Sequence, residues 1–132
     1  MTGAHSTRTL GVAAAHAGAA LLHGVPHAAV PVPLAVWQVS FVTVVAVLPL
    51  AGVWLAHQGR TRSGGWALLT GGLGSFGFGT HFHFLSATPD NVSAVTGGWS
   101  VPFLVTSVGV SLLAAATAAA GGRLLVADRL SG

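Results

Sequence analysis

Hydrophobic residues lie in four long stretches of the chain, separated by short polar or turn-forming segments. The stretches cover about residues 9–30, 32–56, 65–85 and 101–122, and none of them contains Asp, Glu, Lys or Arg. A bilayer core about 30 Å thick is crossed by about 20 apolar residues in a helix. Backbone polar groups in lipid must be satisfied within their own segment, so the pattern predicts transmembrane helices rather than strands.

The short connections make consecutive helices antiparallel neighbours. The sequence therefore predicts an all-α protein, a four-span transmembrane helical bundle that forms a single integral membrane domain over residues 1–132. Pro33 is expected at the start of the second helix, where its missing N–H costs nothing. Thr88-Pro89-Asp90-Asn91 is typical of a turn, with Asp90 or Asn91 capping a short interfacial helix.

The positions of the arginines predict the orientation of the bundle. Positive charges favour the cytoplasmic side, and here they all fall on alternate connections: Arg8, Arg60, Arg62, Arg123 and Arg129. Both termini are therefore expected in the cytoplasm. Tryptophans favour the two membrane interfaces, and they lie near the predicted ends of the spans: Trp54 and Trp66 inside, Trp37 and Trp99 outside.

Composition excludes several classes of protein. The chain is 52% hydrophobic and only 5% charged, with a mean hydropathy of +0.77, which excludes a soluble globule and a disordered chain. The net charge of +3 reflects scarce acids, so no nucleic-acid partner is expected. With no cysteine, thiolate ligands are excluded. We expect a multi-pass protein of the cell membrane, with the lipid bilayer as partner and a homo-oligomer or larger membrane complex left open.

Small residues form matching faces on the third and fourth predicted helices. The third carries Gly71, Gly72, Gly74, Gly77 and Gly79, and the fourth carries Ser107, Ser111, Ala114 and Ala118. Small residues let helices approach closely in lipid, so these faces predict tight packing. A glycine face also leaves room for a flat cofactor, which is the alternative interpretation.

Histidines are the only ionisable residues within the predicted spans, and such residues are treated as functional by default. His23 and His27 are four residues apart and share one helix face, with His16 on the same stripe. His81 and His83 would point about 200° apart in a continuous helix. Both would face one side only if the helix loosened before Ser86.

These histidines are expected to converge near the outer surface with the one acid on that side. Imidazole suits Cu and Zn, so the first hypothesis is a transition-metal site built from His23, His27, His81, His83 and Asp90. The second is a b-type haem with His23 and His81 as axial ligands. Either site would serve metal handling or electron transfer.

A protein of a different class remains open beside these hypotheses. The histidines would then only form hydrogen bonds across helices, and His16 in particular is expected to bond to a Ser or Thr. The chain would be a cofactor-free structural or accessory subunit of a membrane complex. No motif of nucleophilic catalysis or of phosphate binding occurs in the sequence, so an enzyme is not the expected class.

Overall fold

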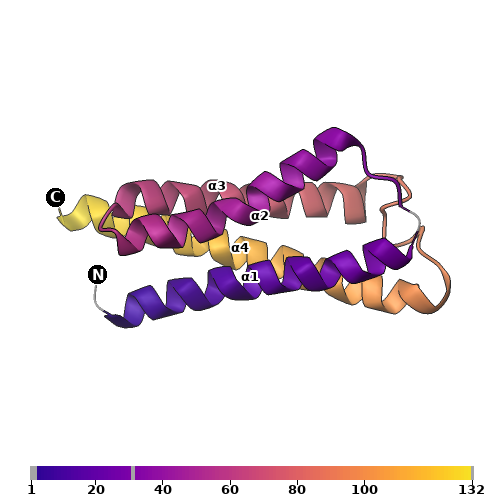
Figure 1. Cartoon of the computed structure of the whole chain (residues 1–132), viewed down its shortest axis with the longest axis horizontal. Helices are drawn as coiled ribbons and strands as arrows, with labels where there is room; N and C mark the ends of the chain where they lie inside the picture. Colours follow the sequence, from indigo (N-terminus) through magenta and orange to yellow (C-terminus); the bar gives the residue numbers. More distant parts are fainter. Residues whose placement is uncertain (1–2, 31, 132) are drawn as a thin grey trace.

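The computed structural model describes residues 3–30 and 32–131, which form four α-helices and no strand (Figure 1). The helices are α1 (Gly3–Ala29), α2 (Val36–His57), α3 (Thr61–Thr80) and α4 (Ser100–Ser131). A π-helical turn, η1 (His81–Leu85), continues α3, and a 3-10 turn, η2 (Gly97–Trp99), leads into α4. The predicted all-α class is confirmed.

The helices run up and down, and both described ends of the chain lie at one end of the bundle (Figure 1). The α2–α3 turn lies at this same end, whereas the α1–α2 connection and the long η1–α4 loop lie at the other. The antiparallel order predicted from the short connections is therefore correct.

The second helix begins at Val36, so the prediction that Pro33 starts it is wrong. Ala35 is still extended, with a ψ of 151°, and its N–H donates to the Gln38 side chain at 2.7 Å. That bond satisfies a backbone donor that the first helical turn leaves unpaired, which sets the start of the helix. The helix ends at His57, and Gly59 just beyond it has a φ of 78°, which lets the Arg60 N–H donate back to the Leu55 carbonyl at 3.0 Å.

The predicted turn after the third helix is present, but the helix expected to follow it is not. The Asn91 N–H donates to the Thr88 carbonyl at 3.0 Å, which closes the turn. The Asn91 side chain then accepts the Ser93 N–H at 2.9 Å and the Ser93 hydroxyl at 2.7 Å. These local bonds compete with a helical turn, so residues 92–96 contain no helix.

Glycines hold α3 against the backbones of its neighbours. A Cβ atom added to Gly72 would lie 2.5 Å from the Ala118 nitrogen and 2.7 Å from the Ala114 carbonyl oxygen on α4. One added to Gly71 would lie 2.8 Å from the Pro49 ring on α2. The expected small-residue packing is therefore present, and at these glycines it leaves no room for a flat cofactor.

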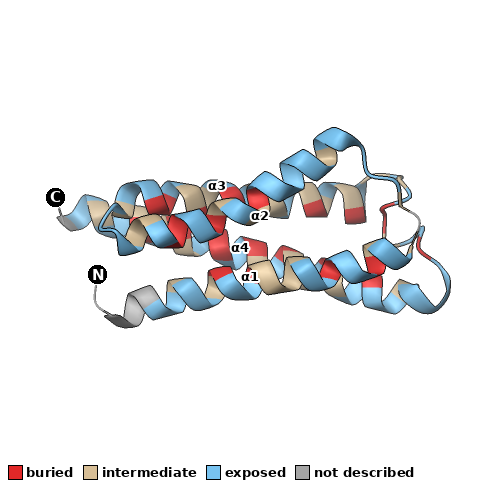
Figure 2. Ribbon diagram, in the orientation of Figure 1, coloured by how far each residue is buried: buried red, intermediate tan, exposed pale blue. Residues whose placement is uncertain are grey.

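Two helical segments of the described chain are long and apolar enough to cross a membrane. These are Val36–His57, with a mean hydropathy of 2.2, and Gly97–Leu130, with a mean hydropathy of 1.9. The first and third helices are less apolar because histidines, glycines and hydroxyl side chains replace aliphatic residues there. Figure 2 shows that buried residues line the inside of the bundle while much of the outside is exposed.

The close approach at Gly72 makes a testable prediction. Gly72→Ala should lower the free energy of unfolding by about 1–3 kcal/mol, because the added methyl group meets backbone atoms that cannot rotate away. Gly77→Ala, on the same helix, is the matched control, because a Cβ there has no described atom within 4 Å. The control should be neutral or stabilising by up to about 1 kcal/mol. Equal unfolding transitions in detergent micelles for both variants would contradict this packing.

Candidate metal centre

Three histidines from two distant parts of the chain meet inside the bundle. His23 and His27 lie on α1, one turn apart, and His83 lies on η1. One ring nitrogen of each lies within 4.8 Å of the others, and His23 Nε2 is 3.1 Å from His83 Nε2. A tetrahedral ion with metal–nitrogen bonds of about 2.0–2.1 Å separates its ligand nitrogens by about 3.3 Å. The His23–His83 pair is near this separation, and all three rings are close enough to one another to hold a metal ion.

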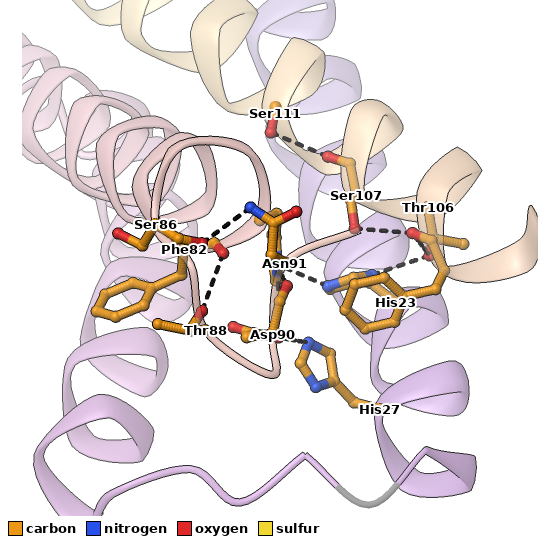
Figure 3. A network of polar contacts seen from close by, with 12 residues as sticks. His23, His27, Phe82, Ser86, Thr88, Asp90, Asn91, Thr106, Ser107 and Ser111 are labelled. Atoms are coloured by element: carbon orange, nitrogen blue, oxygen red, sulfur yellow. Dashed lines mark hydrogen bonds and ion pairs between the residues drawn. The ribbon is translucent and has the colours of Figure 1, made fainter. Parts of the chain in front are cut away.

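The outer nitrogens of two of these rings are already engaged. His23 Nδ1 lies 2.9 Å from the Thr106 hydroxyl on α4 (Figure 3), and His83 Nδ1 donates to the Asp90 backbone carbonyl at 3.0 Å. A metal-binding histidine almost always has such a partner on its second nitrogen, because that bond sets the orientation and tautomer of the ring.

The hydrogen-bond partners fix the proton of neutral His83 and allow two arrangements at His23. The Asp90 carbonyl only accepts, so neutral His83 holds its proton on Nδ1 and directs a lone pair from Nε2 towards His23. The Thr106 hydroxyl donates to the Pro102 carbonyl at 2.7 Å in one of its orientations. It then accepts from His23 Nδ1, which leaves a second lone pair on His23 Nε2. In this arrangement two lone pairs face each other at 3.1 Å, as two ligands of one cation would.

Asp90 is a buried acid without hydrogen bonds to its side chain. Only 4% of it is exposed, and neither carboxylate oxygen has a hydrogen-bond partner among the described residues. Its Oδ1 lies 3.3 Å from His27 Nε2 and 3.4 Å from His83 Nδ1. A buried carboxylate is costly unless positive charge compensates it. Asp90 touches the outer nitrogen of His83, and so lies beside the ring cluster rather than between the facing nitrogens.

The loop after the third helix brings Asp90 to the histidines. The Val92 N–H donates to the His83 carbonyl at 2.9 Å, which folds the loop back over η1. The Asn91 amide donates to the Ser86 carbonyl at 2.9 Å (Figure 3). These two bonds, one on each residue that follows Asp90, hold its side chain in the bundle.

His81 is not part of this cluster. The helix does loosen before Ser86, since the Ser86 N–H donates to the His81 carbonyl in a π-type bond of 2.8 Å. Even so, His81 stays exposed and its Nε2 pairs with the Ser86 hydroxyl at 2.8 Å. The expected convergence thus holds for His23, His27, His83 and Asp90. It fails for His81, because its ring points away from the interior of the bundle.

Phe103 is a site residue that the sequence did not reveal. It is fully buried on α4, and its ring centroid lies 5.2 Å from His23, 4.9 Å from His27 and 5.5 Å from His83. It forms an apolar wall against which all three imidazoles pack. From the sequence, a phenylalanine of an apolar stretch that packs against histidines cannot be distinguished from one that faces lipid. Its position four residues after the η2 turn is the nearest signal.

His16 lies deeper in the bundle and forms the kind of bond that was expected for it. Its Nε2 pairs with the Ser75 hydroxyl on α3 at 3.0 Å, and only 2% of the residue is exposed. This is a bond across helices to a serine, as predicted.

The haem pairing of His23 with His81 has no support in the geometry. His81 is exposed and paired with Ser86, while His23 lies in direct contact with His83. The glycines that were to make room for the ring at Gly71 and Gly72 are packed against α2 and α4 instead. The three clustered histidines are, in contrast, close enough together to hold a metal ion.

The chain matches no family model, no curated protein and no solved structure.

The Phe103 wall makes a testable prediction. Phe103→Ala should lower the free energy of unfolding by about 3 kcal/mol, because it removes a fully buried ring that contacts three others. Phe76→Ala is the control, since that ring on α3 is 38% exposed and its loss should cost distinctly less. Unfolding in detergent micelles measures both values, and a Phe103 variant as stable as the Phe76 variant would refute the assigned packing.

Proposed function

We propose that this protein is a small multi-pass membrane protein that binds one transition-metal ion through His23, His27 and His83. The observation that carries the proposal is the approach of the three ring nitrogens, all within 4.8 Å, beside a buried carboxylate with no hydrogen bond. Imidazole ligands suit copper and zinc. A divalent ion would also offset the negative charge of Asp90, which is buried beside two histidines that are neutral when they bind a metal.

Within this proposal the surrounding residues act on the ligands. Asp90 and Thr106 hold the outer nitrogens of the rings, as carboxylates and hydroxyls do behind metal-binding histidines. Phe103 limits the rotation of the three rings. Such a site serves metal handling, or electron transfer if the ion is copper. The ligands come from α1 and η1, so binding the ion would link the first helix to the turn that follows the third.

Four membrane spans with both termini in the cytoplasm form the second part of the proposal. Large apolar side chains are exposed on the outside of all four helices, among them Leu21 at 79%, Val36 at 84%, Leu73 at 54% and Val105 at 62%. Soluble monomers rarely expose contiguous apolar patches of more than a few hundred Å². All four tryptophans are exposed near helix ends, as an interfacial belt requires: Trp37, Trp54, Trp66 and Trp99.

Metal binding tests the first part of the proposal. Purified protein should bind about one equivalent of Zn²⁺ or Cu²⁺ by elemental analysis after dialysis. His23→Ala and His83→Ala should each abolish stoichiometric binding, whereas His81→Ala, the matched control from the same turn, should keep it. Asp90→Asn should weaken binding about 10–100-fold. Binding should also weaken on acidification, because protons compete for the imidazole nitrogens.

The result that would overturn the metal site is equally clear. A folded wild-type protein that retains no Zn²⁺ or Cu²⁺, with histidine variants of unchanged stability, would leave the cofactor-free accessory subunit as the better explanation. A visible absorption spectrum of the same sample would reveal any haem.

Single-cysteine labelling tests the membrane arrangement, since the natural chain has no cysteine to interfere. Ser93→Cys lies in the loop assigned to the outer side, and Ser63→Cys lies at the end assigned to the cytoplasm; both positions are exposed. In intact cells a membrane-impermeant maleimide should label Ser93→Cys at once and Ser63→Cys only after permeabilisation. The reverse pattern would invert the topology, and equal labelling would refute it.

A further inference from the structure

A cavity of about 190 Å³ adjoins the histidine cluster. Histidines 23, 27 and 83 and Asp90 line one of its walls, and Ser75 is the other polar residue in its lining. The rest of the lining is apolar and comes from all four helices, including Ala20, Gly24, Val42, Val45, Phe78 and Val110. The cavity thus combines a hydrocarbon interior with one polar wall that carries the proposed metal ligands.

The volume of the cavity indicates the size of its ligand. A cavity of about 150 Å³ lined by Leu, Ile and Phe stays dry in water and binds benzene or xenon. The present cavity is somewhat larger and its lining is mostly apolar apart from the polar wall, so it accommodates a single six-membered ring with one small substituent.

The mouth of the cavity lies between α1 and α2. Among the lining residues the exposed ones are Gly24 on α1, Val42 on α2 and Leu34 just before α2. Figure 1 shows the first half of α2 diverging from α1 at this end of the bundle. In the proposed membrane arrangement the mouth faces lipid, so a ligand would enter from the bilayer.

The polar wall indicates the chemistry of the ligand. Three protein nitrogens leave at least one coordination position of a tetrahedral ion for an outside ligand. The Asp90 carboxylate is 4% exposed, has no hydrogen-bond partner among the described residues, and lines the cavity, as a group that accepts a proton from a hydroxyl would.

We infer that this cavity binds a small lipid-soluble molecule with a ring-sized apolar body and one hydroxyl group, of the phenol class, with its oxygen directed at the histidine and aspartate wall. The inference rests on the proposed function, because the metal site supplies the position that the oxygen takes. It identifies the class of molecule that would meet the bound ion.

The test measures binding of 4-fluorophenol and fluorobenzene by ¹⁹F NMR to the zinc-loaded protein in lipid nanodiscs. Partition into lipid rises linearly with probe concentration, so the saturable part reports the cavity. Wild-type protein should bind 4-fluorophenol saturably and at least tenfold more tightly than fluorobenzene, and added phenol should displace it.

Cavity-filling variants provide the control. A Cβ added to Gly24 or to Gly18 has no described atom within 4 Å, so either position of α1 accepts a larger side chain without meeting the backbone. Only Gly24 lines the cavity. Gly24→Phe should weaken saturable binding at least tenfold, and Gly18→Phe should leave it unchanged. Ala46→Phe, which fills the cavity from α2, should repeat the effect of Gly24→Phe.

The possible results separate the two proposals. If zinc binds with one equivalent but saturable probe binding is absent, or is equal in Gly24→Phe, Ala46→Phe and wild type, the cavity inference is overturned and the metal site stands. If elemental analysis finds no bound zinc, the metal site is overturned. Probe binding that the two filling variants still abolish would then support the cavity alone.

Discussion

The close contact between the backbone of α3 and those of its neighbours is the constraint on which the rest of the structure depends. Glycines at positions 71 and 72 let α3 lie against Pro49 on one side and Ala118 on the other. His83 lies on η1, which continues α3, whereas Phe103 and Thr106, which contact the histidines, lie on α4. The packing of α3 against α4 therefore sets the position of His83 relative to these two residues. The geometry of the histidine cluster is thus determined by glycines several helical turns away, which take no part in the proposed metal binding.

The first helix is held in a different way. A Cβ added to Gly11, Gly18 or Gly24 has no described atom within 4 Å, so these glycines give α1 no close backbone approach. The side chains of His16 and His23 instead form hydrogen bonds from α1 to α3, η1 and α4. Hydrogen bonds between membrane helices contribute about 0.6 kcal/mol on average. A metal ion shared between α1 and η1 would add a much stronger link to the most loosely attached helix.

Regular periodicity made much of this arrangement predictable from the sequence. Charge-free apolar stretches identified four helices, and the four-residue spacing of His23 and His27 correctly placed both rings on one face. Which of His81 and His83 faces the bundle was beyond prediction, because a π turn that begins at His81 rotates His83 relative to it, and no local residue type marks such a turn. The role of the glycines was also ambiguous, because a glycine face can make room either for a ring cofactor or for the backbone of a neighbouring helix. Only the structure shows that the neighbouring helices fill this space at Gly71 and Gly72.

The Thr106 hydroxyl connects the site to proton movement. In one orientation it donates to the Pro102 carbonyl and accepts from His23, and in the other it donates to His23, whose Nε2–H then bonds to His83. Changing from one arrangement to the other needs only a rotation about one C–O bond and the relocation of a proton on an imidazole. In the second arrangement the His23 Nε2 proton lies between the two nitrogens, where a bound ion would be, so this proton and an ion exclude each other.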